Sequence, residues 1–196
     1  RKLLPIDLNT GVSLLSVFND FIQNKILYKK LSPHCNERIV KRKYVAFFLQ
    51  VPVDSQMIDH SPFYDCFFEM IKDVICVLPS EYDLIIREHP HYRCKYDERI
   101  YDLVDKNSNV MLDNTTELQQ LISSSDLCIL NNSTVGIEAL LLNKKVFNLG
   151  KAYYTHKGIT FDYTGERDKL KQELLAALTA NIASDAVSSF MYQLIF

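Results

Sequence analysis

From Tyr44 onward the chain alternates short apolar segments with longer amphipathic ones, and this alternation limits its fold more than any other feature. The apolar segments are short, rich in β-prone residues and apolar throughout, as buried parallel strands are. They cover residues 44–49, 82–87, 109–112, 126–130 and 145–149. Segments of about ten residues or more, with apolar side chains at helical spacing, lie between them. Five strands separated by helices predict an α/β fold with a Rossmann-like, doubly wound parallel sheet.

Capping patterns mark the start of two of the helices. Ser61 precedes Pro62, which predicts a helix with Ser61 as its N-cap and Pro62 at its first position. Asn114 and Glu117 have the spacing of a capping box, which predicts a helix over 115–123. Further helices are predicted over residues 12–30, 95–105, 133–142, 166–181 and 184–196.

The chain divides into three parts. Residues 1–43 hold an amphipathic helix and a basic linker, residues 44–164 hold the predicted sheet, and residues 165–196 hold two closing helices. Between Lys25 and Lys43 there are seven Lys or Arg residues and one acid. We interpret this segment as a solvated remnant of, or connector to, an N-terminal domain, with contact to anionic lipid headgroups as the alternative.

The composition excludes several classes of protein. Of the 196 residues, 47% are hydrophobic and 23% are charged, which is typical of a globular domain and not of a disordered or collagen-like chain. The net charge of −2, from 22 basic and 24 acidic side chains, disfavours a nucleic-acid partner, because such binding needs a basic surface. No apolar run reaches the roughly 20 residues of a transmembrane helix.

The cysteines and the N-terminus predict a reducing, cytoplasmic location. Five cysteines without a Cys-x-x-Cys pair favour free thiols over disulfides or a zinc ribbon. The chain begins with Arg1 and shows no charged-then-apolar leader pattern, so we interpret it as a fragment of a cytoplasmic protein. Cys76 and Cys128 lie in apolar segments and are expected in the core.

Polar residues follow the predicted strands at their carboxyl ends, where doubly wound sheets bind ligands. Gln50, Asp54 and Gln56 come after the first strand. Asp54 is a candidate nucleophile or general base, and the two glutamines are candidates for binding sugar hydroxyls. The alternative for Asp54 is that it only caps a turn.

A second polar segment, 87–93, follows the second strand and contains a His-Pro pair flanked by arginines. Pro90 favours an extended conformation of the preceding residue, which places His89 at the strand end. There the imidazole can donate to a phosphate oxygen, and Arg87 or Arg93 can add bidentate contacts. His89 and His91 are not expected to bind a metal, because an extended segment directs them to opposite sides and no third ligand is evident.

The strongest local pattern follows the fourth strand, where polar residues lead into a helix. Asn132, Ser133 and Thr134 bring hydroxyls and backbone N–H groups to a helix N-terminus, which predicts a phosphate site. Gly136 is expected to let a group approach the backbone closely, since glycine within a helix costs about 1 kcal/mol relative to alanine. Glu138 shares a helix face with Thr134 and is a candidate for binding ribose hydroxyls. The alternative is that Ser133 only caps the helix and Glu138 is a surface acid.

Motifs of other nucleotide-binding and hydrolytic folds are absent from the sequence. It contains no G-x-G-x-x-G, no G-x-x-x-x-G-K-[ST] and no G-x-S-x-G. These absences disfavour dinucleotide binding of the common type, P-loop chemistry and the α/β-hydrolase fold. After the fifth strand, Tyr153 or Tyr154 is a candidate for stacking on a base, with an ordinary surface loop as the alternative.

Three segments together, 49–56, 87–93 and 131–154, resemble the capsule polysaccharide biosynthesis family, bacterial Kdo transferases that use CMP-Kdo. Their order and spacing match, and the resemblance extends from about Tyr44 to Tyr163. It implies a GT-B fold of two Rossmann-like domains facing across a cleft, with this chain as the C-terminal, nucleotide-binding half. It also implies transfer of Kdo, with retention of configuration, to a lipid or glycan acceptor in capsule or surface-polysaccharide synthesis.

The resemblance implies roles for individual residues as well. His89 and Pro90 would contact the CMP phosphate. The Asn-Ser-x-x-Gly-x-Glu segment, for phosphate and ribose, falls on Asn132, Ser133, Gly136 and Glu138. Gln50 and Asp54 would lie at the cleft, with Asp54 as the carboxylate that attacks the anomeric carbon. Arg-Glu stands before His-Pro where a lysine-type residue is expected, so Arg87 is the candidate for that phosphate contact.

The implied partners are a nucleotide sugar and a lipid or glycan acceptor, with no metal and no cofactor. Peripheral contact with the inner face of the cytoplasmic membrane, or with other capsule-assembly proteins, is an open alternative. So are three other enzymes, namely a CDP-glycerol-type phosphotransferase, a CMP-sialic-acid transferase and a UDP-sugar epimerase. A non-catalytic nucleotide-binding module is a further alternative, since the resemblance leaves open whether this chain is active by itself.

Overall fold

The computed structural model describes residues 42–52, 60–180 and 184–195. Within these ranges the chain forms a six-stranded sheet in which all neighbouring strands are parallel. In the order of the sheet, the strands are β3 (Val110–Leu112), β2 (Asp83–Arg87), β1 (Tyr44–Phe48), β4 (Leu127–Leu130), β5 (Val146–Asn148) and β6 (Phe161–Asp162). The predicted α/β fold with a doubly wound parallel sheet is confirmed.

The strand order reverses at β1, which lies between β2 and β4. The chain runs outward from β1 through β2 to β3, and then returns to the other side of β1 to form β4. The last residue of β1, Phe48, is level with Arg87 at the end of β2 and with Leu130 at the end of β4. The loops after these three strands therefore leave the sheet at one edge, which is where doubly wound sheets bind ligands.

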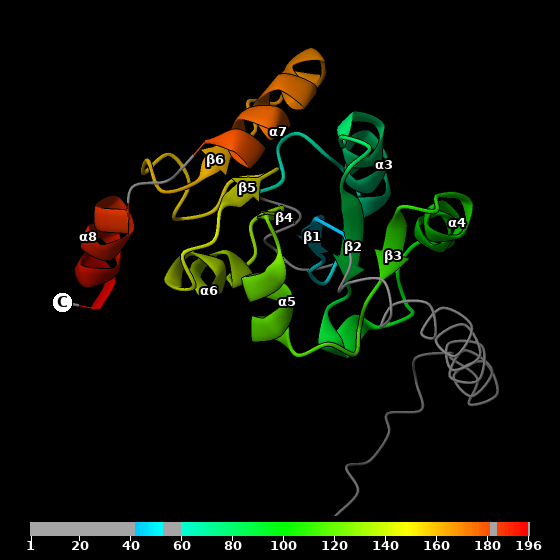
Figure 1. The fold of residues 1–196 in the computed structure, drawn as a ribbon, viewed down its shortest axis with the longest axis horizontal. Helices are drawn as coiled ribbons and strands as arrows, with labels where there is room; N and C mark the ends of the chain where they lie inside the picture. The colour runs from blue at the N-terminus through cyan, green and yellow to red at the C-terminus, as the bar shows by residue number, and fades with distance from the viewer. Residues whose placement is uncertain (1–41, 53–59, 181–183, 196) are drawn as a thin grey trace, which may run out of the picture.

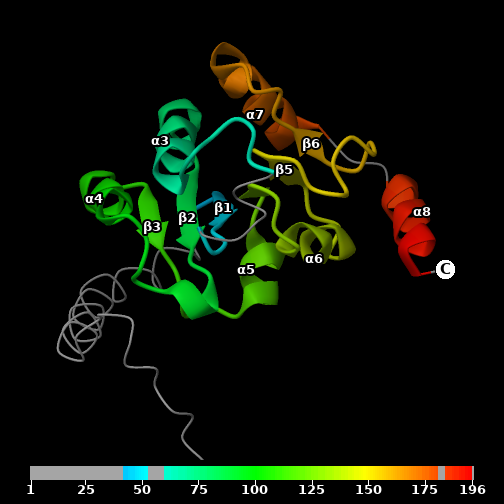
Figure 2. The same cartoon turned by 180° about the vertical axis from the view of Figure 1, so that it is seen from behind.

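Helices cover both faces of the sheet and give three layers (Figure 1). One face carries α3 (Phe67–Val77), α4 (Glu98–Lys106) and α7 (Leu170–Thr179). The other face carries α5 (Leu118–Ser124), α6 (Val135–Leu141) and α8 (Ser184–Ile195). Figure 2 shows the layers from behind, with α8 at the β6 end of the molecule and α4 at the opposite end.

Side chains alternate between the two faces along β1, because successive residues of a strand point to opposite sides. Val45 and Phe47 join the core beneath α3, while Tyr44, Ala46 and Phe48 join the core beneath α5 and α6. All five side chains are buried. Burial on both faces explains why this segment is apolar throughout.

The predicted start of the first helix after β1 is wrong. α3 begins at Phe67, with Cys66 at the N-cap position, and not directly after Ser61. The Ser61 hydroxyl donates to the Tyr64 carbonyl oxygen at 2.7 Å, which closes a turn ahead of the helix. A serine next to a proline therefore marks a turn here and not a helix cap.

The capping box predicted at Asn114 is also wrong. α5 begins one residue after Glu117, which is itself the N-cap and accepts the N–H groups of Gln119 at 3.3 Å and Gln120 at 3.2 Å. The Asn114 side chain pairs instead with Glu88, which lies 26 residues earlier in the chain. A hydrogen bond to a buried carboxylate is stronger than a local capping bond, and it takes Asn114 away from the helix.

The other strands and helices predicted after residue 44 are confirmed, with boundaries shifted by a few residues. β6 was not predicted, because two residues are too short to carry a periodic pattern. The predicted helix over 12–30 and the basic segment lie outside the described residues. Among the helices that the structure describes, none combines the length and the apolar character needed to span a bilayer.

The four cysteines within the described ranges are free thiols, as expected. Cys128 on β4 is buried, and burial raises the pKa of its thiol to about 11. Cys76 is exposed on α3, so its predicted place in the core is wrong. The apolar run around Cys76 belongs to an amphipathic helix, in which only one side faces the sheet.

Candidate functional site

Three loops meet at the edge of the sheet where β1, β2 and β4 end. Gln50 follows β1, His89 follows β2, and Asn132 follows β4. Because all three strands are parallel and adjacent, their carboxyl ends lie at the same edge. The structure thus brings together residues that sequence analysis singled out at three separate places.

A hydrogen-bonded pair of amides joins the loops after β1 and β4. Gln50 Nε2 donates to Asn132 Oδ1 at 2.7 Å, and Asn132 Nδ2 donates to the His60 carbonyl oxygen at 3.1 Å. Gln50 and Asn132 are 7% and 6% exposed. Gln50 Oε1 is buried without a hydrogen-bond partner in the described structure. This oxygen is therefore an enclosed, unpaired acceptor where the strand order reverses.

His89 is half-buried, and its own turn sets the role of each ring nitrogen. His89 Nδ1 accepts the backbone N–H of His91 at 3.3 Å. A neutral imidazole has one donor nitrogen and one acceptor nitrogen, so the proton then lies on Nε2. His89 is therefore prepared to donate a hydrogen bond through Nε2.

The expectation that His89 and His91 point to opposite sides is wrong. Pro90–Tyr92 form a short 3-10 helix instead of an extended segment, and the two imidazole rings lie 5.6 Å apart. Pro90 occupies the first position of this helix and is exposed. Within the described ranges no three His, Cys, Asp or Glu side chains gather closely enough to hold a metal ion.

Tyr96 ties the loop after β2 to the loop after β1. Its hydroxyl accepts the His89 N–H at 3.1 Å and donates to the Gln50 carbonyl oxygen at 3.1 Å. Burial raises the pKa of Tyr96, so its phenol stays protonated and able to donate. Two residues predicted for the site are thus linked by a third that the sequence pattern did not single out.

Arg87 is turned toward the end of β3. Its Nη1 donates to the Asp113 carbonyl oxygen at 3.0 Å and lies 3.9 Å from Asp113 Oδ1. Burial raises the pKa of Asp113, but hydrogen bonds from Thr116 and Thr115 lower it by more. The pKa of Asp113 is therefore below its ordinary value. Arg87 therefore links the end of β2 to an ionised carboxylate that follows β3. Its contact with a phosphate stays a prediction.

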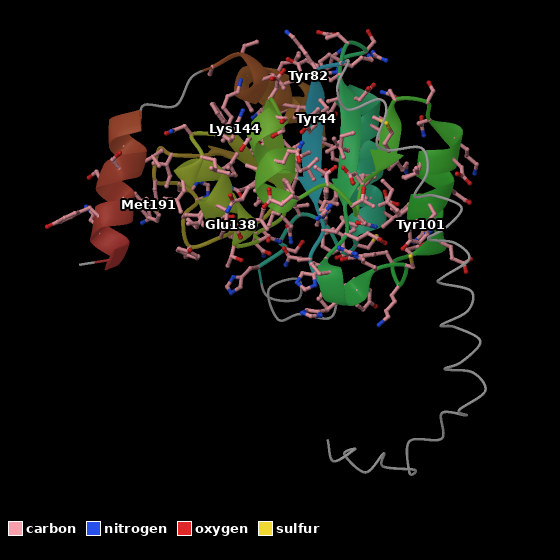
Figure 3. The ribbon with its side chains drawn as sticks, turned by 60° about the horizontal axis from the view of Figure 1, so that its bottom comes forward. Tyr44, Tyr82, Tyr101, Glu138, Lys144 and Met191 are labelled. Atoms are coloured by element: carbon pink, nitrogen blue, oxygen red, sulfur yellow. The ribbon has the colours of Figure 1, made fainter. Side chains whose placement is uncertain are left out.

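The loop after β4 leads into α6 through Ser133 and Thr134. The Ser133 hydroxyl accepts the Val135 N–H at 3.3 Å, while the Thr134 side chain makes no capping hydrogen bond. Thr134 and Glu138 are exposed, and Figure 3 shows Glu138 on α6. Both side chains are accessible to a ligand at this edge, and their contacts with phosphate and ribose stay predictions.

Gly136 is needed for a close approach, but the group that approaches belongs to this chain. A Cβ at this position would lie 2.2 Å from the Tyr154 hydroxyl oxygen and 2.6 Å from Tyr154 Cζ. Tyr154 is fully buried, and its hydroxyl donates to the Ser133 carbonyl oxygen. Tyr154 is therefore a buried support for the start of α6 and cannot stack on a base, whereas Tyr153 is exposed.

Asp54 and Gln56 lie outside the described residues, so their roles as nucleophile and sugar contact stay predictions. His60 is the first residue described after this gap, and its carbonyl oxygen also accepts the Lys151 N–H at 2.9 Å. His60 therefore lies beside the loops after β4 and β5.

Sequence analysis missed the group of residues that organises the loop after β2. Its members are Glu88, Tyr96, Tyr101 and Asn114. A signal was present, because Glu88 directly follows a buried strand and Asn114 follows the next strand along the chain. Polar residues at the carboxyl ends of neighbouring parallel strands are expected to meet.

Comparison with known proteins identifies the family. The family model described as "Capsule polysaccharide biosynthesis protein" matches residues 17–190. The capsule polysaccharide export protein KpsS of Escherichia coli is 29% identical over 149 residues, which are 70% of this chain and 37% of KpsS. This chain therefore spans well under half the length of that relative.

Solved structures share the fold at low identity. The β-Kdo 2,7 transferase KpsC of Thermosulfurimonas dismutans superposes with a TM-score of 0.51 at 20% identity, over 94% of this chain and 62% of that chain. The UDP-GlcNAc 2-epimerase of Methanocaldococcus jannaschii superposes with a TM-score of 0.54 at 14% identity, over 88% and 49%. At these identities the likeness establishes a common fold, found in both a glycosyltransferase and an epimerase.

Proposed function

This chain belongs to the capsule polysaccharide biosynthesis protein family, and we propose that it forms the donor-binding half of a glycosyltransferase that transfers Kdo from CMP-Kdo. The acceptor is a lipid or glycan of the bacterial surface. The observation that carries the proposal is the meeting of the His89 turn with the Gln50–Asn132 pair at the edge where the strand order reverses. Such an edge is the usual nucleotide site of this architecture.

The chemistry of the site suits a cytidylate leaving group. When the anomeric carbon of the sugar separates from the phosphate oxygen, negative charge develops on CMP. A donor held in place before the reaction stabilises that charge without reorganising. His89 presents Nε2 as such a donor, because Nδ1 is already engaged by the His91 N–H.

The start of α6 supplies the second group of contacts in the proposal. Asn132, Ser133 and Thr134 lie beside the phosphate, and Glu138 accepts the hydroxyls of the ribose. Asn132 is positioned by Gln50, while Thr134 and Glu138 are exposed. These placements support a nucleotide that lies along the edge from His89 toward α6.

The proposed reaction proceeds by double displacement. The Asp54 carboxylate attacks the anomeric carbon, the bond to the phosphate oxygen breaks, and CMP leaves with the electron pair. The acceptor oxygen then bonds to the anomeric carbon, Asp54 leaves as a carboxylate with the electron pair, and the acceptor proton passes to water, so that the original configuration is restored. The donors of the site meet the phosphate charge, and the scheme needs no metal or cofactor.

Thermal shift with nucleotides tests the donor. CMP at saturating concentration is expected to raise the Tm of the full chain, and UMP is expected to raise it less. His89→Ala is expected to abolish most of the CMP shift, because it removes the Nε2 donor. His91→Ala is the matched control, since it removes an exposed ring and keeps the backbone N–H that His89 Nδ1 accepts.

Four outcomes count against the proposal. An equal CMP shift in wild type and His89→Ala removes His89 from the site. A larger response to UMP favours the epimerase that shares this fold. Binding of CMP without consumption of CMP-Kdo by the full-length protein favours the non-catalytic module, whereas consumption of CMP-sialic acid or CDP-glycerol redirects the donor.

A further inference from the structure

Glu88 is a buried carboxylate directly before His89, and no step of the proposed reaction uses it. It is 1% exposed. Its Oε1 accepts the Tyr101 hydroxyl at 2.6 Å and the Cys94 N–H at 3.1 Å, and its Oε2 accepts Asn114 Nδ2 at 2.5 Å. Three donors therefore surround one carboxylate, as the burial of a charge requires.

The donors come from three different elements around the turn. Tyr101 lies on α4, Asn114 follows β3, and Cys94 belongs to the turn itself. Asn114 also accepts the Glu88 N–H through Oδ1 at 3.1 Å, so the two residues pair reciprocally. Cys94 has a φ of 58°, a left-handed conformation that is unfavourable for a residue with a side chain. The Glu88 carboxylate thus holds both ends of the turn to the neighbouring elements.

A short chain of contacts runs from Glu88 to the proposed ligand site. The Tyr101 hydroxyl, which donates to Glu88, accepts the Tyr96 N–H at 3.3 Å. The Tyr96 hydroxyl in turn accepts the His89 N–H and donates to the Gln50 carbonyl oxygen. The carboxylate therefore acts on His89 from two sides, through the adjacent peptide and through Tyr101 and Tyr96.

Replacing a buried ionic group and its partners by well-packed apolar side chains is often neutral or stabilising, so the Glu88 network is not needed merely to fill this space. Burial raises the pKa of Glu88, although hydrogen bonds from Tyr101, Cys94 and Asn114 and the positive charge of Arg93 partly offset this. A buried charge that lowers stability but specifies one arrangement of its donors is a known use of such groups. The arrangement that it specifies here is the turn that carries His89.

We propose that Glu88 is a positioning residue, whose hydrogen bonds to Tyr101, Asn114 and Cys94 fix the turn on which His89 presents Nε2 to the phosphate of the donor nucleotide. This rests on the proposed function, because His89 has its role only there. The geometric part concerns the His89 turn in the free protein and is testable without a nucleotide.

A substitution and its compensating partner test the network in the full chain. In Glu88→Gln either orientation of the amide places its N–H groups against a donor, which is Asn114 Nδ2 in one case and the Cys94 N–H in the other. In the double variant Glu88→Gln, Asn114→Asp, the introduced amide donates to the introduced carboxylate and every bond is restored. Asp83→Asn is the matched control, a buried acid-to-amide change at the opposite end of β2.

The readouts are the imidazole signals of His89 in NMR spectra of the free protein and the affinity for CMP by calorimetry. Glu88→Gln is expected to shift the His89 signals and to weaken CMP binding about tenfold, which is the scale of one lost hydrogen bond. The double variant is expected to return both toward wild type, and Asp83→Asn is expected to change neither. Rescue by the partner distinguishes positioning from a general loss of structure.

Unchanged His89 signals and CMP affinity in Glu88→Gln would overturn the proposal. Equal losses of CMP affinity in Glu88→Gln and in the double variant would also overturn the proposal. The restored hydrogen bonds would then have no effect on His89. If Glu88→Gln does not fold, the folded double variant decides by the same two readouts. If wild type does not bind CMP, the proposed function fails, and the His89 signals still decide whether Glu88 sets the turn.

Discussion

The turn after β2 and the turn before α6 lie at the same edge of the sheet, but different forces order them. Around His89 the order comes from a buried carboxylate and tyrosine hydroxyls. At the start of α6 it comes from close packing, where the Tyr154 ring fills the space beside Gly136. The stability of the His89 turn should therefore depend on side-chain charge, and the stability of the turn before α6 should depend on side-chain volume.

The largest effect is expected from Gly136→Ala. The new Cβ would overlap the Tyr154 ring, and overpacking of this kind costs about 3 kcal/mol. Urea unfolding of the single variants and of Gly136→Ala with Tyr154→Ala measures the coupling. Removing the ring makes room for the Cβ, so the double variant should lose less than the sum of the two single losses. Additive losses would show that the contact with Tyr154 is not what destabilises Gly136→Ala.

A smaller loss is expected from Tyr101→Phe, which removes a donor from the buried Glu88 carboxylate and also removes the acceptor of the Tyr96 N–H. Hydrogen bonds to charged groups contribute about 2 kcal/mol, against about 1 kcal/mol for a bond to a neutral acceptor. Tyr44→Phe is the matched comparison, because Tyr44 is equally buried and its hydroxyl donates to the neutral Leu121 carbonyl oxygen at 2.8 Å. The two tyrosines lie apart, on α4 and β1 (Figure 3). Equal losses of unfolding free energy would contradict a special role for the charge.

The buried carboxylate in the turn after β2 should also make the stability of the protein depend on pH. The pKa of Glu88 is raised above its ordinary value of 4.5 by burial, so the folded state binds this proton more tightly than the unfolded chain does. The stability that this proton contributes is complete below pH 4.5 and is lost as the pH rises through the raised pKa. Urea unfolding of wild type and Glu88→Gln over a pH series measures the difference. A difference that does not change with pH would contradict the raised pKa.

The smallest effect on stability is expected from Thr134→Ala at the start of α6. Thr134 is exposed and makes no capping bond, so the free energy of unfolding should change by less than about 0.5 kcal/mol. The CMP-induced shift in Tm should nevertheless decrease if the hydroxyl contacts the phosphate. An unchanged shift in Tm would show that the Thr134 hydroxyl does not contact the phosphate, which would leave Ser133 and Asn132 as the proposed contacts. A large loss of stability would show that Thr134 has a structural role.

Much of the fold was predictable because strands buried on both faces are apolar throughout. The segment 44–49 has this pattern, and the structure gives β1 at that place. Helix starts were less predictable, since a cap depends on what else its side chain can reach. Asn114 had the local pattern of a cap, but the Glu88 carboxylate lies within its reach across the sheet edge.

The candidate site divides in the same way. The sequence pointed to His89 and Asn132 as polar residues at strand ends, and the parallel sheet brings their loops together. It did not point to Tyr96 or Tyr101, because a tyrosine on or before an amphipathic helix has the pattern of an ordinary core residue. Their hydrogen bonds depend on distances that no local pattern contains.

The sequence by itself determined the layers of this protein, because the spacing of apolar residues along the chain shows which faces of a helix or strand are buried. Only the tertiary structure decided which polar groups meet. Glu88 with Asn114 and Ser133 with Tyr154 are separated by 26 and 21 residues. Such pairs form because a buried polar group must find a partner wherever the fold provides one.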